Sequence, residues 1–311
     1  MVATAQEVQS LDTCLLRPGN TNCGGCGMST GLTMLGRALD AAGDTCTLVI
    51  PACCGIITAG RFPTTSYGVP TIATTFASAA AVASGVASIR DLNGEPGQVI
   101  CWAGDGGTYD IGFATVSAAA ERNENIIYIC YDNEIYGNTG GQRSSATPAG
   151  ARTATTPFGK SEGKKDIMSI MTAHRIPYAA TLSIAHPEDF AQKISTALSI
   201  EGMRFLLMHS PCPTGWKSEP EESVELVRVA TASGLFPVYE VFDGATYRIN
   251  VRPDGTDPAP YFEKQRRFRD DEIDLDATRE ASTPSSRLSR TRTLISALFP
   301  SCGRHDPQQL P

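Results

Sequence analysis

The chain has 311 residues and a formal net charge of −7, with 41% hydrophobic and 19% charged side chains, values typical of a soluble globular protein with one large α/β domain or two ordinary ones. The first 260 residues contain no block of Lys and Arg, which argues against duplex nucleic acid or an anionic membrane as a partner. No stretch is apolar enough for a membrane span or a signal peptide, so we expect a cytoplasmic protein.

The N-terminal part predicts an arm, two helices and a strand. Residues 1–20 have no sustained hydrophobic period and are interpreted as the arm. Residues 27–39 have the 3.6-residue spacing of an amphipathic helix, and the apolar run at 47–50 predicts a short buried strand. Residues 76–89 are rich in Ala and Ser, which predicts a helix whose small side chains let another backbone approach closely.

The next segment has the order strand, Gly-rich turn, helix, strand. A strand at 98–103 leads into Gly104-Asp105-Gly106-Gly107, a helix follows at 111–122, and an apolar strand follows at 125–131. A crossover of this kind joins parallel strands. We therefore predict an α/β fold whose sheet is mostly parallel and has helices on both faces.

After Asn133 the sequence predicts no helix or strand for about 30 residues. A loop of that length in a compact domain is usually functional or disordered. Helices are then predicted at 166–173 and 187–198, and strands at 178–182 and 204–209. Residues 269–311 are charged and rich in Ser and Thr, which predicts a poorly ordered tail and leaves 21–268 as the main domain.

Several isolated residues receive structural interpretations. The basic side chains late in the long loop are expected to form a solvated face, with a docking edge as the alternative: Lys160, Lys164 and Lys165. The isolated histidines are expected to cap helices or to pack: His174, His186 and His209. Three residues of the apolar strands are expected in the core: Cys101, Trp102 and Cys130.

Two polar motifs follow buried strands, and ligands bind at the carboxyl ends of strands in open α/β sheets. Asp105 and Asn133 are separated by one strand-helix-strand crossover, so their side chains can meet in one crevice. A carboxylate and an amide oxygen suit Mg²⁺, and the glycines around Asp105 let the chain approach a diphosphate closely. The alternative is that Gly-Asp-Gly forms a tight turn and that Asp132 caps a helix, but the two motifs at this spacing favour a cofactor site.

The ten cysteines need an explanation other than disulfides, because thiols in a reducing compartment more often bind metal or sulfide. Cys23-Gly-Gly-Cys26 alone is compatible with zinc, an iron–sulfur centre or a redox dithiol. Cys54 and Cys212 follow predicted strands, so four thiolates from three loops make a plausible Cys₄ site. The alternative is that Cys53, Cys54 and Cys212 are small buried hydrophobic residues.

A longer motif is far more specific, and it reads Tyr131-Asp-Asn-Glu-Ile-Tyr-Gly-Asn-Thr-Gly-Gly-Gln-Arg-Ser-Ser-Ala-Thr-Pro148. With the cysteine motifs it resembles the β subunits of the 2-oxoacid:ferredoxin oxidoreductase family, those for pyruvate above all. The resemblance extends over roughly residues 15–268 and implies a thiamine-diphosphate-binding fold. It further implies that Asp105, Asn133 and the main-chain carbonyl of Ile135 hold Mg²⁺, which bridges the diphosphate.

The resemblance also implies the remaining site residues. The cofactor-binding residues would be Gly104, Asp105, Gly106, Gly107, Asn133, Ile135, Tyr136, Asn138 and Thr139, with Asn138 catalytic. The ligands of a [4Fe–4S] cluster would be Cys23, Cys26, Cys54 and Cys212. Cys54 is preferred to Cys53 because the family cysteine is the fourth residue after an isoleucine, here Ile50. The sequence departs from the family at Ala77-Ser78-Ala79, where Glu-Asn-Ala is usual, so a polar contact near the cofactor is expected to be absent or moved.

The implied reaction is the oxidative decarboxylation of pyruvate with coenzyme A to acetyl-CoA and CO₂. Electrons would pass from thiamine diphosphate to the cluster and on to ferredoxin through another subunit. The implied partners are the α-, γ- and δ-type subunits, and one of them would supply the glutamate that activates the cofactor. We therefore expect this chain to be inactive alone and to act in a hetero-oligomer.

Three alternatives remain open at this point. The same chemistry could act on oxalate, phenylglyoxylate or a branched-chain oxoacid. A thiamine carboligase or simple decarboxylase would need Asp105 and Asn133 but not the four cysteines. A non-catalytic iron–sulfur electron carrier would need the cysteines but neither Asp105 nor Asn133.

Overall fold

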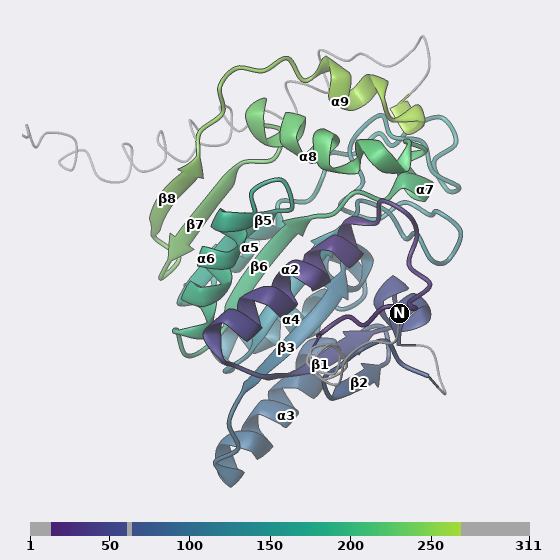
Figure 1. Cartoon of the computed structure of the whole chain (residues 1–311). Coiled ribbons are helices and arrows are strands. Elements are labelled where there is room, and N and C mark those ends of the chain that lie inside the picture. The colour runs from purple at the N-terminus through teal and green to yellow at the C-terminus, as the bar shows by residue number, and fades with distance from the viewer. Residues whose placement is uncertain (1–13, 61–63, 269–311) are drawn as a thin grey trace, which may run out of the picture.

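The computed structural model describes residues 14–60 and 64–268, which fold around one eight-stranded sheet (Figure 1). The strand order is β2-β1-β3-β4-β6-β5-β7-β8. Six strands pair in parallel: β1 (Cys46–Pro51), β2 (Thr71–Thr74), β3 (Gln98–Gly104), β4 (Ile127–Asp132), β5 (Tyr178–Ser183) and β6 (Arg204–His209). The hairpin of β7 (Val238–Phe242) and β8 (Thr246–Val251) extends the sheet beyond β5 by antiparallel pairing. The predicted α/β class and mostly parallel sheet are confirmed.

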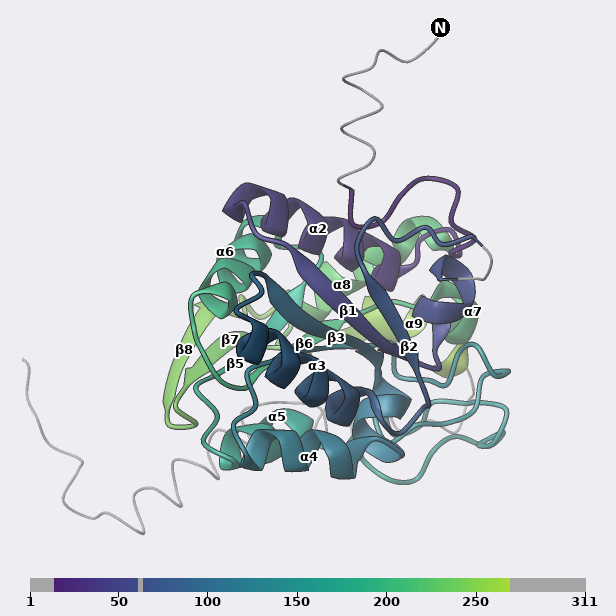
Figure 2. The ribbon, with the colours of Figure 1, turned by 90° about the horizontal axis from the view of Figure 1, so that it is seen from below.

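Helices cover both faces of the sheet (Figure 2). Helices α2 (Gly27–Ala42) and α6 (Pro187–Leu198) pack on one face. Helices α3 (Ala79–Asn93), α4 (Phe113–Glu121) and α5 (Ile167–Ala173) pack on the other. Three further helices lie in the C-terminal part: α7 (Pro213–Trp216), α8 (Ser223–Ala232) and α9 (Ala259–Glu263).

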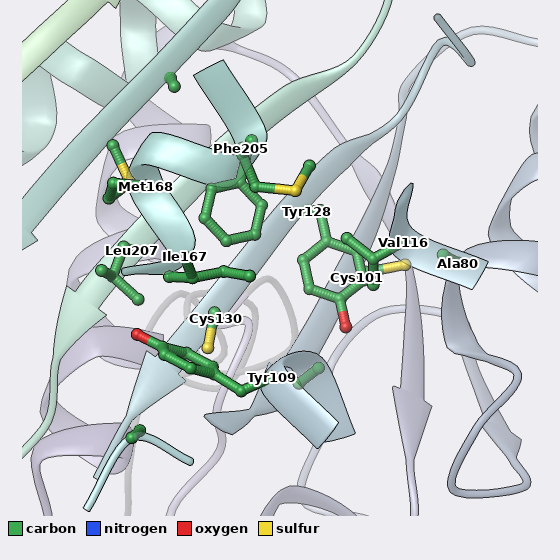
Figure 3. Packing of buried hydrophobic residues seen from close by; sticks show 14 of the residues in the cluster. Ala80, Cys101, Tyr109, Val116, Tyr128, Cys130, Ile167, Met168, Phe205 and Leu207 are labelled. Carbon is green, nitrogen blue, oxygen red and sulfur yellow. The ribbon is translucent and has the colours of Figure 1, made fainter. Parts of the chain in front are cut away.

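The core is divided by the sheet into two clusters, and strand β4 contributes to both. Ile129 and Tyr131 point toward α2 and α6, whereas Tyr128 and Cys130 point toward α4 and α5. On the second side the ring of Tyr128 stacks on Phe205 at 5.9 Å between centroids (Figure 3). A strand that is buried on both faces reads as a continuous apolar run, which is why these strands were predictable from sequence. The core positions expected for Cys101, Trp102 and Cys130 are confirmed.

The predicted strands and helices up to His209 are present, with boundaries shifted by a few residues. The helix expected at 76–89 begins only at Ala79, because a turn through residues 75–78 follows the edge strand β2. The sequence did not predict β2, α7, α8, β7, β8 or α9. Within the described ranges no helix is long and apolar enough to cross a membrane.

The long loop contains no helix or strand between residues 138 and 165, as predicted, but its lysines are not a solvated face. Lys160 is 3% exposed and donates to the carbonyl of Thr147 at 2.7 Å. Lys164 forms two buried ion pairs, and Lys165 donates to the carbonyl of Tyr109. The solvated-face interpretation was therefore wrong, because in a loop with few apolar residues these ammonium groups satisfy carbonyls and carboxylates inside the fold.

The predicted arm and tail lie largely outside the described residues. From the arm, Leu15 and Leu16 are buried, and Leu15 packs against α2 where Gly36 leaves room for it. The histidine interpretations are confirmed. His186 is the N-cap residue of α6, His174 is the C-cap residue of α5, and His209 packs between aromatic rings.

Candidate functional site

The two predicted cofactor motifs follow neighbouring strands. Strands β3 and β4 are parallel and pair Gly104 with Tyr131, so Asp105 and Asn133 leave the sheet at the same edge. Both side chains are buried, at 1% and 7% exposure. Asp132 is not a helix cap, because no helix follows it and its carboxylate pairs with Lys164 at 2.7 Å. The fold therefore brings the two motifs together, and the place where they meet at this edge of the sheet is called the crevice below.

Within that crevice the three predicted Mg²⁺ ligands are in contact. One terminal atom of the Asn133 amide lies 2.7 Å from Asp105 Oδ1 and 2.7 Å from the carbonyl oxygen of Ile135. With the amide in one orientation, its NH₂ group bridges the two oxygens. With the amide in the other orientation, three oxygens face one another, an arrangement that a hard cation such as Mg²⁺ would stabilise.

The charges around this point favour the second orientation when a cation is present. Burial and the negative charge of Asp132 raise the pKa of Asp105. Asp105 itself forms no ion pair within the described part of the chain; its Oδ2 accepts from the hydroxyl of Ser144. Among the described residues, Lys164 pairs with Asp132 and Glu134, and Arg267 pairs with Glu134. With all three carboxylates ionised the buried group would carry one excess negative charge, which a bound cation would offset, and its donor set fits Mg²⁺.

One glycine of the first motif allows close packing of an aromatic ring. A Cβ on Gly106 would lie 2.2 Å from Cε1 of Tyr136, so only glycine fits there. The Tyr136 hydroxyl donates to Asp110 Oδ2 at 2.9 Å, and its ring meets Phe76 edge-on at 5.8 Å. A Cβ on Gly107 would lie 3.4 Å from Phe76, an ordinary contact. Gly106 therefore lets the ring of Tyr136 approach the first motif closely, whereas the position of Phe76 does not require a glycine at 107.

The last two predicted cofactor residues lie further out. Asn138 and Thr139 are exposed. Thr139 forms hydrogen bonds with Gln142 in the same turn, from its hydroxyl to Oε1 at 2.5 Å and from Nε2 to its carbonyl at 2.9 Å. The hydrogen bonds of Thr139 stay within this turn, and the roles of Asn138 and Thr139 stay predictions.

The four predicted cluster cysteines lie beside this crevice, on three segments. Cys26 is the N-cap residue of α2, Cys54 follows β1, and Cys212 is the N-cap residue of α7. The Thr214 hydroxyl lies 3.9 Å from Cys23 Sγ, which connects the Cys212 segment to the Cys-x-x-Cys segment. Burial, together with the nearby thiols of the other three and of Cys53, raises the pKa of Cys54 to about 12.

Cys53 differs from Cys54 in its surroundings. Its thiol hydrogen-bonds with the Tyr131 hydroxyl, and burial raises its pKa. For Cys212, in contrast, burial raises the pKa to about 11, and the nearby thiols of Cys26 and Cys23 raise it further. This arrangement favours Cys54 over Cys53 as the third thiol of the group.

Within residues 14–60 and 64–268, no three side chains of His, Cys, Asp or Glu lie close enough together to hold a single metal ion.

Sequence reasoning missed a set of polar residues that surround the carboxylates. They come from the long loop and from the C-terminal end of the described chain: Ser144, Thr147, Lys164 and Arg267. Thr147 donates to the carbonyl of Glu134 at 2.6 Å. The one signal available was the polar run Gln142-Arg-Ser-Ser-Ala-Thr147, which belongs to the motif already singled out.

Comparisons with known proteins show the family of the chain. Residues 53–208 match the family model "Thiamine pyrophosphate enzyme, C-terminal TPP binding domain". The pyruvate synthase subunit PorB of Methanothermobacter marburgensis is 44% identical, over 82% of this chain and 89% of its own. The ketoisovalerate oxidoreductase subunit VorB of Pyrococcus horikoshii is 43% identical, over 81% of this chain and 84% of its own.

The fold has a counterpart among solved structures. The 2-oxoglutarate:ferredoxin oxidoreductase of Magnetococcus marinus matches with a TM-score of 0.61 and 23% identity, over 86% of this chain and 94% of the matched chain. With relatives above 40% identity along four-fifths of its length, the chain belongs to the thiamine-diphosphate-dependent 2-oxoacid:ferredoxin oxidoreductase family.

Proposed function

We propose that this chain is the β-type subunit of a pyruvate:ferredoxin oxidoreductase and that it holds both Mg²⁺–thiamine diphosphate and a [4Fe–4S] cluster. Asp105, Asn133 and the carbonyl of Ile135 hold the magnesium ion. Cys23, Cys26, Cys54 and Cys212 hold the cluster.

One observation carries the proposal, and it concerns Gly137. A Cβ on Gly137 would lie 3.6 Å from Cys212 Sγ, 3.9 Å from Cys54 Sγ and 3.8 Å from Nδ2 of Asn133. Two proposed cluster ligands and a proposed Mg²⁺ ligand therefore surround the same residue. This neighbourhood supports a two-cofactor function over a carboligase, which needs no cysteines, and over an electron carrier, which needs no Mg²⁺ site.

The residues of the chain have distinct roles in this function. Thiamine diphosphate, when bound, would supply the nucleophile for the 2-oxo carbon and an electron sink. Asp105 and Asn133 would hold the Mg²⁺ that accompanies the diphosphate, and Tyr136 and Phe76 pack edge-on beside them. We assign Asn138 a catalytic contact with the reacting part of the cofactor, and the backbone of residues 104–107 and Thr139 to the diphosphate.

Pyruvate is the substrate we propose, with coenzyme A as acyl acceptor and ferredoxin as electron acceptor. Relatives named for pyruvate and for ketoisovalerate are similarly distant, at 44% and 43% identity, so a branched-chain oxoacid is the second candidate. The relatives named as subunits support a hetero-oligomer with α-, γ- and δ-type partners, in which a partner provides the activating glutamate and most substrate contacts.

The test is a panel of 2-oxoacids given to the anaerobically purified complex with coenzyme A and a viologen acceptor. We expect pyruvate to have the highest kcat/KM and the isolated chain to show no turnover. A preference for ketoisovalerate would establish the second candidate. Full turnover by the isolated chain, loaded with its cofactors, would refute the need for a partner.

A further inference from the structure

Glu134 lies between Asn133 and Ile135, and its backbone is in the left-handed region at φ 62°. Residues other than glycine rarely adopt this conformation. The turn keeps the Asn133 amide within 2.7 Å of the Ile135 carbonyl oxygen. The Glu134 carboxylate is buried and is held by Lys164 at 2.9 Å and by Arg267 at 2.5 Å. The shape of the metal-binding turn therefore depends on the groups that hold Glu134.

Arg267 comes from the C-terminal end of the described chain and is fully buried. Its guanidinium lies over the ring of Trp216, at 4.4 Å from the centroid, and over Phe268 at 4.8 Å. Its Nε donates to Gln265 at 2.9 Å, and its carbonyl accepts from the N–H of Arg152 at 2.8 Å. A buried arginine with this planar stacking has a defined place in the fold, unlike an exposed ion pair.

Trp216 connects the same turn to the cysteine segment. Its indole N–H donates to the carbonyl of Asn133 at 2.8 Å, and its backbone N–H donates to the carbonyl of Cys212 at 2.7 Å. Asn133 and Glu134 are consecutive, and one is held by Trp216 while the other is held by Arg267. Trp216 and Arg267 also contact each other, so both together join the metal-binding turn to the segment of Cys212.

We propose that Glu134, Arg267 and Trp216, here called the clamp, are positioning residues that fix the Mg²⁺–diphosphate turn relative to the cluster segment. The proposal rests on the proposed function, which assigns a cofactor to each of these segments. Arg267 acts on the diphosphate side through Glu134 and on the cluster side through Trp216. Electron transfer slows steeply with distance, so a fixed spacing between the two segments sustains the reaction rate.

The experiment uses the assembled complex with Arg267→Met, Glu134→Gln and the double variant. Two quantities are measured: the dissociation constant for thiamine diphosphate at fixed Mg²⁺, and the electron paramagnetic resonance spectrum of the reduced cluster at full iron content. We expect Arg267→Met to weaken thiamine diphosphate binding about tenfold and to change the cluster spectrum, as outer partners of a metal site do. The double variant should be no worse than Arg267→Met alone, because the two residues act as a pair.

Two further variants keep the test decisive. Arg267→Lys keeps the charge but loses the planar stacking, so it should give smaller changes of both quantities, and it replaces Arg267→Met if that variant fails to assemble. Arg248→Met breaks another Arg–Glu pair of the same 2.5 Å length, with Glu240 in the β7–β8 hairpin, and should change neither quantity.

The outcomes separate this proposal from the function it rests on. The clamp is refuted if Arg267→Met and Glu134→Gln leave thiamine diphosphate affinity and the cluster spectrum as in the wild type, or if their effects simply add. A wild-type complex that contains no iron bound to this chain, or no thiamine diphosphate, would overturn the proposed function instead.

Discussion

The oxygen-lined crevice around Asp105 and the thiol group around Cys54 meet at Gly137, yet they are built differently. In the crevice the side chains are buried and already touch at hydrogen-bond distance. In the thiol group Cys23 is exposed, and burial keeps Cys54 and Cys212 protonated. Under the proposed function, the oxygen site would therefore be formed before its cofactor binds, whereas the thiol site would take its final geometry from the cluster.

The largest expected effect concerns the preformed site. Asp105→Ala should weaken Mg²⁺-dependent binding of thiamine diphosphate by more than about 100-fold, since even outer-shell changes cost 10–100-fold. The free energy of unfolding of the cofactor-free protein should not fall, because the variant removes a carboxylate that burial and Asp132 disfavour in its charged form. Cofactor titration and urea unfolding measure the two quantities separately.

The matched control is Asp189→Ala, which removes an aspartate paired with Lys193 in α6, away from the crevice. That variant should lose stability and keep its affinity for thiamine diphosphate. Unchanged cofactor affinity in Asp105→Ala would show that the crevice is not the metal site.

The second effect compares two adjacent cysteines. Cys54→Ser should lose most of the bound iron and the broad absorbance of the cluster, because the serine oxygen is a poor ligand for it. Cys53→Ser should retain both, since its thiol faces Tyr131. Iron analysis and absorbance spectra of the two variants, prepared side by side without oxygen, decide the matter. The reverse pattern would make Cys53 the ligand, and bound zinc without iron would remove the electron-transfer role.

The third effect tests how the thiol site assembles. Burial raises the pKa of Cys54 to about 12 and that of Cys212 to about 11, so both thiols carry protons near neutral pH. Binding of the cluster requires thiolates and must release these protons. Reconstitution in weak buffer should therefore acidify the solution, and cluster occupancy should rise as the pH is raised from 7 to 9. Occupancy that does not depend on pH would indicate thiolates that exist before the cluster binds.

The last effect concerns the stability of the fold and not cofactor binding, and it centres on His209, which packs against Trp216. Burial lowers its pKa from 6.5 to about 4, so the unfolded chain binds a proton that the folded chain does not. Stability from this group is complete above pH 6.5 and is lost as the pH falls toward 4, by roughly 3 kcal/mol. His209→Phe should flatten the pH dependence of urea unfolding between pH 7 and 4. An unchanged slope in that variant would locate the acid sensitivity in other groups.

The sequence predicts those parts of this arrangement that depend on residues close together in the chain. Apolar runs predict the buried strands, and the spacing of Asp105 and Asn133 across one crossover predicts that they meet. The hairpin of β7 and β8 escaped prediction because it lies at an edge, where β8 is largely exposed and shows no apolar run.

The charge network escaped prediction for a different reason. Arg267 lies 133 residues from Glu134 along the chain, and no local pattern relates them. Lys164 resembles a surface residue in sequence, and only the long loop folding over the carboxylates buries it. Pairing of this kind is a property of tertiary structure and carries no periodic signal.

The central claim is that this one chain provides the protein ligands of both cofactors and that electrons pass between them. The most direct test loads the isolated chain with a Mössbauer-active iron isotope and sulfide, then combines it with unlabelled partner subunits, Mg²⁺ and thiamine diphosphate. The account predicts labelled iron in a [4Fe–4S] cluster that is reduced when pyruvate is added and stays oxidised without thiamine diphosphate. Labelled iron that is not in such a cluster, or that pyruvate leaves oxidised in the active complex, would contradict it.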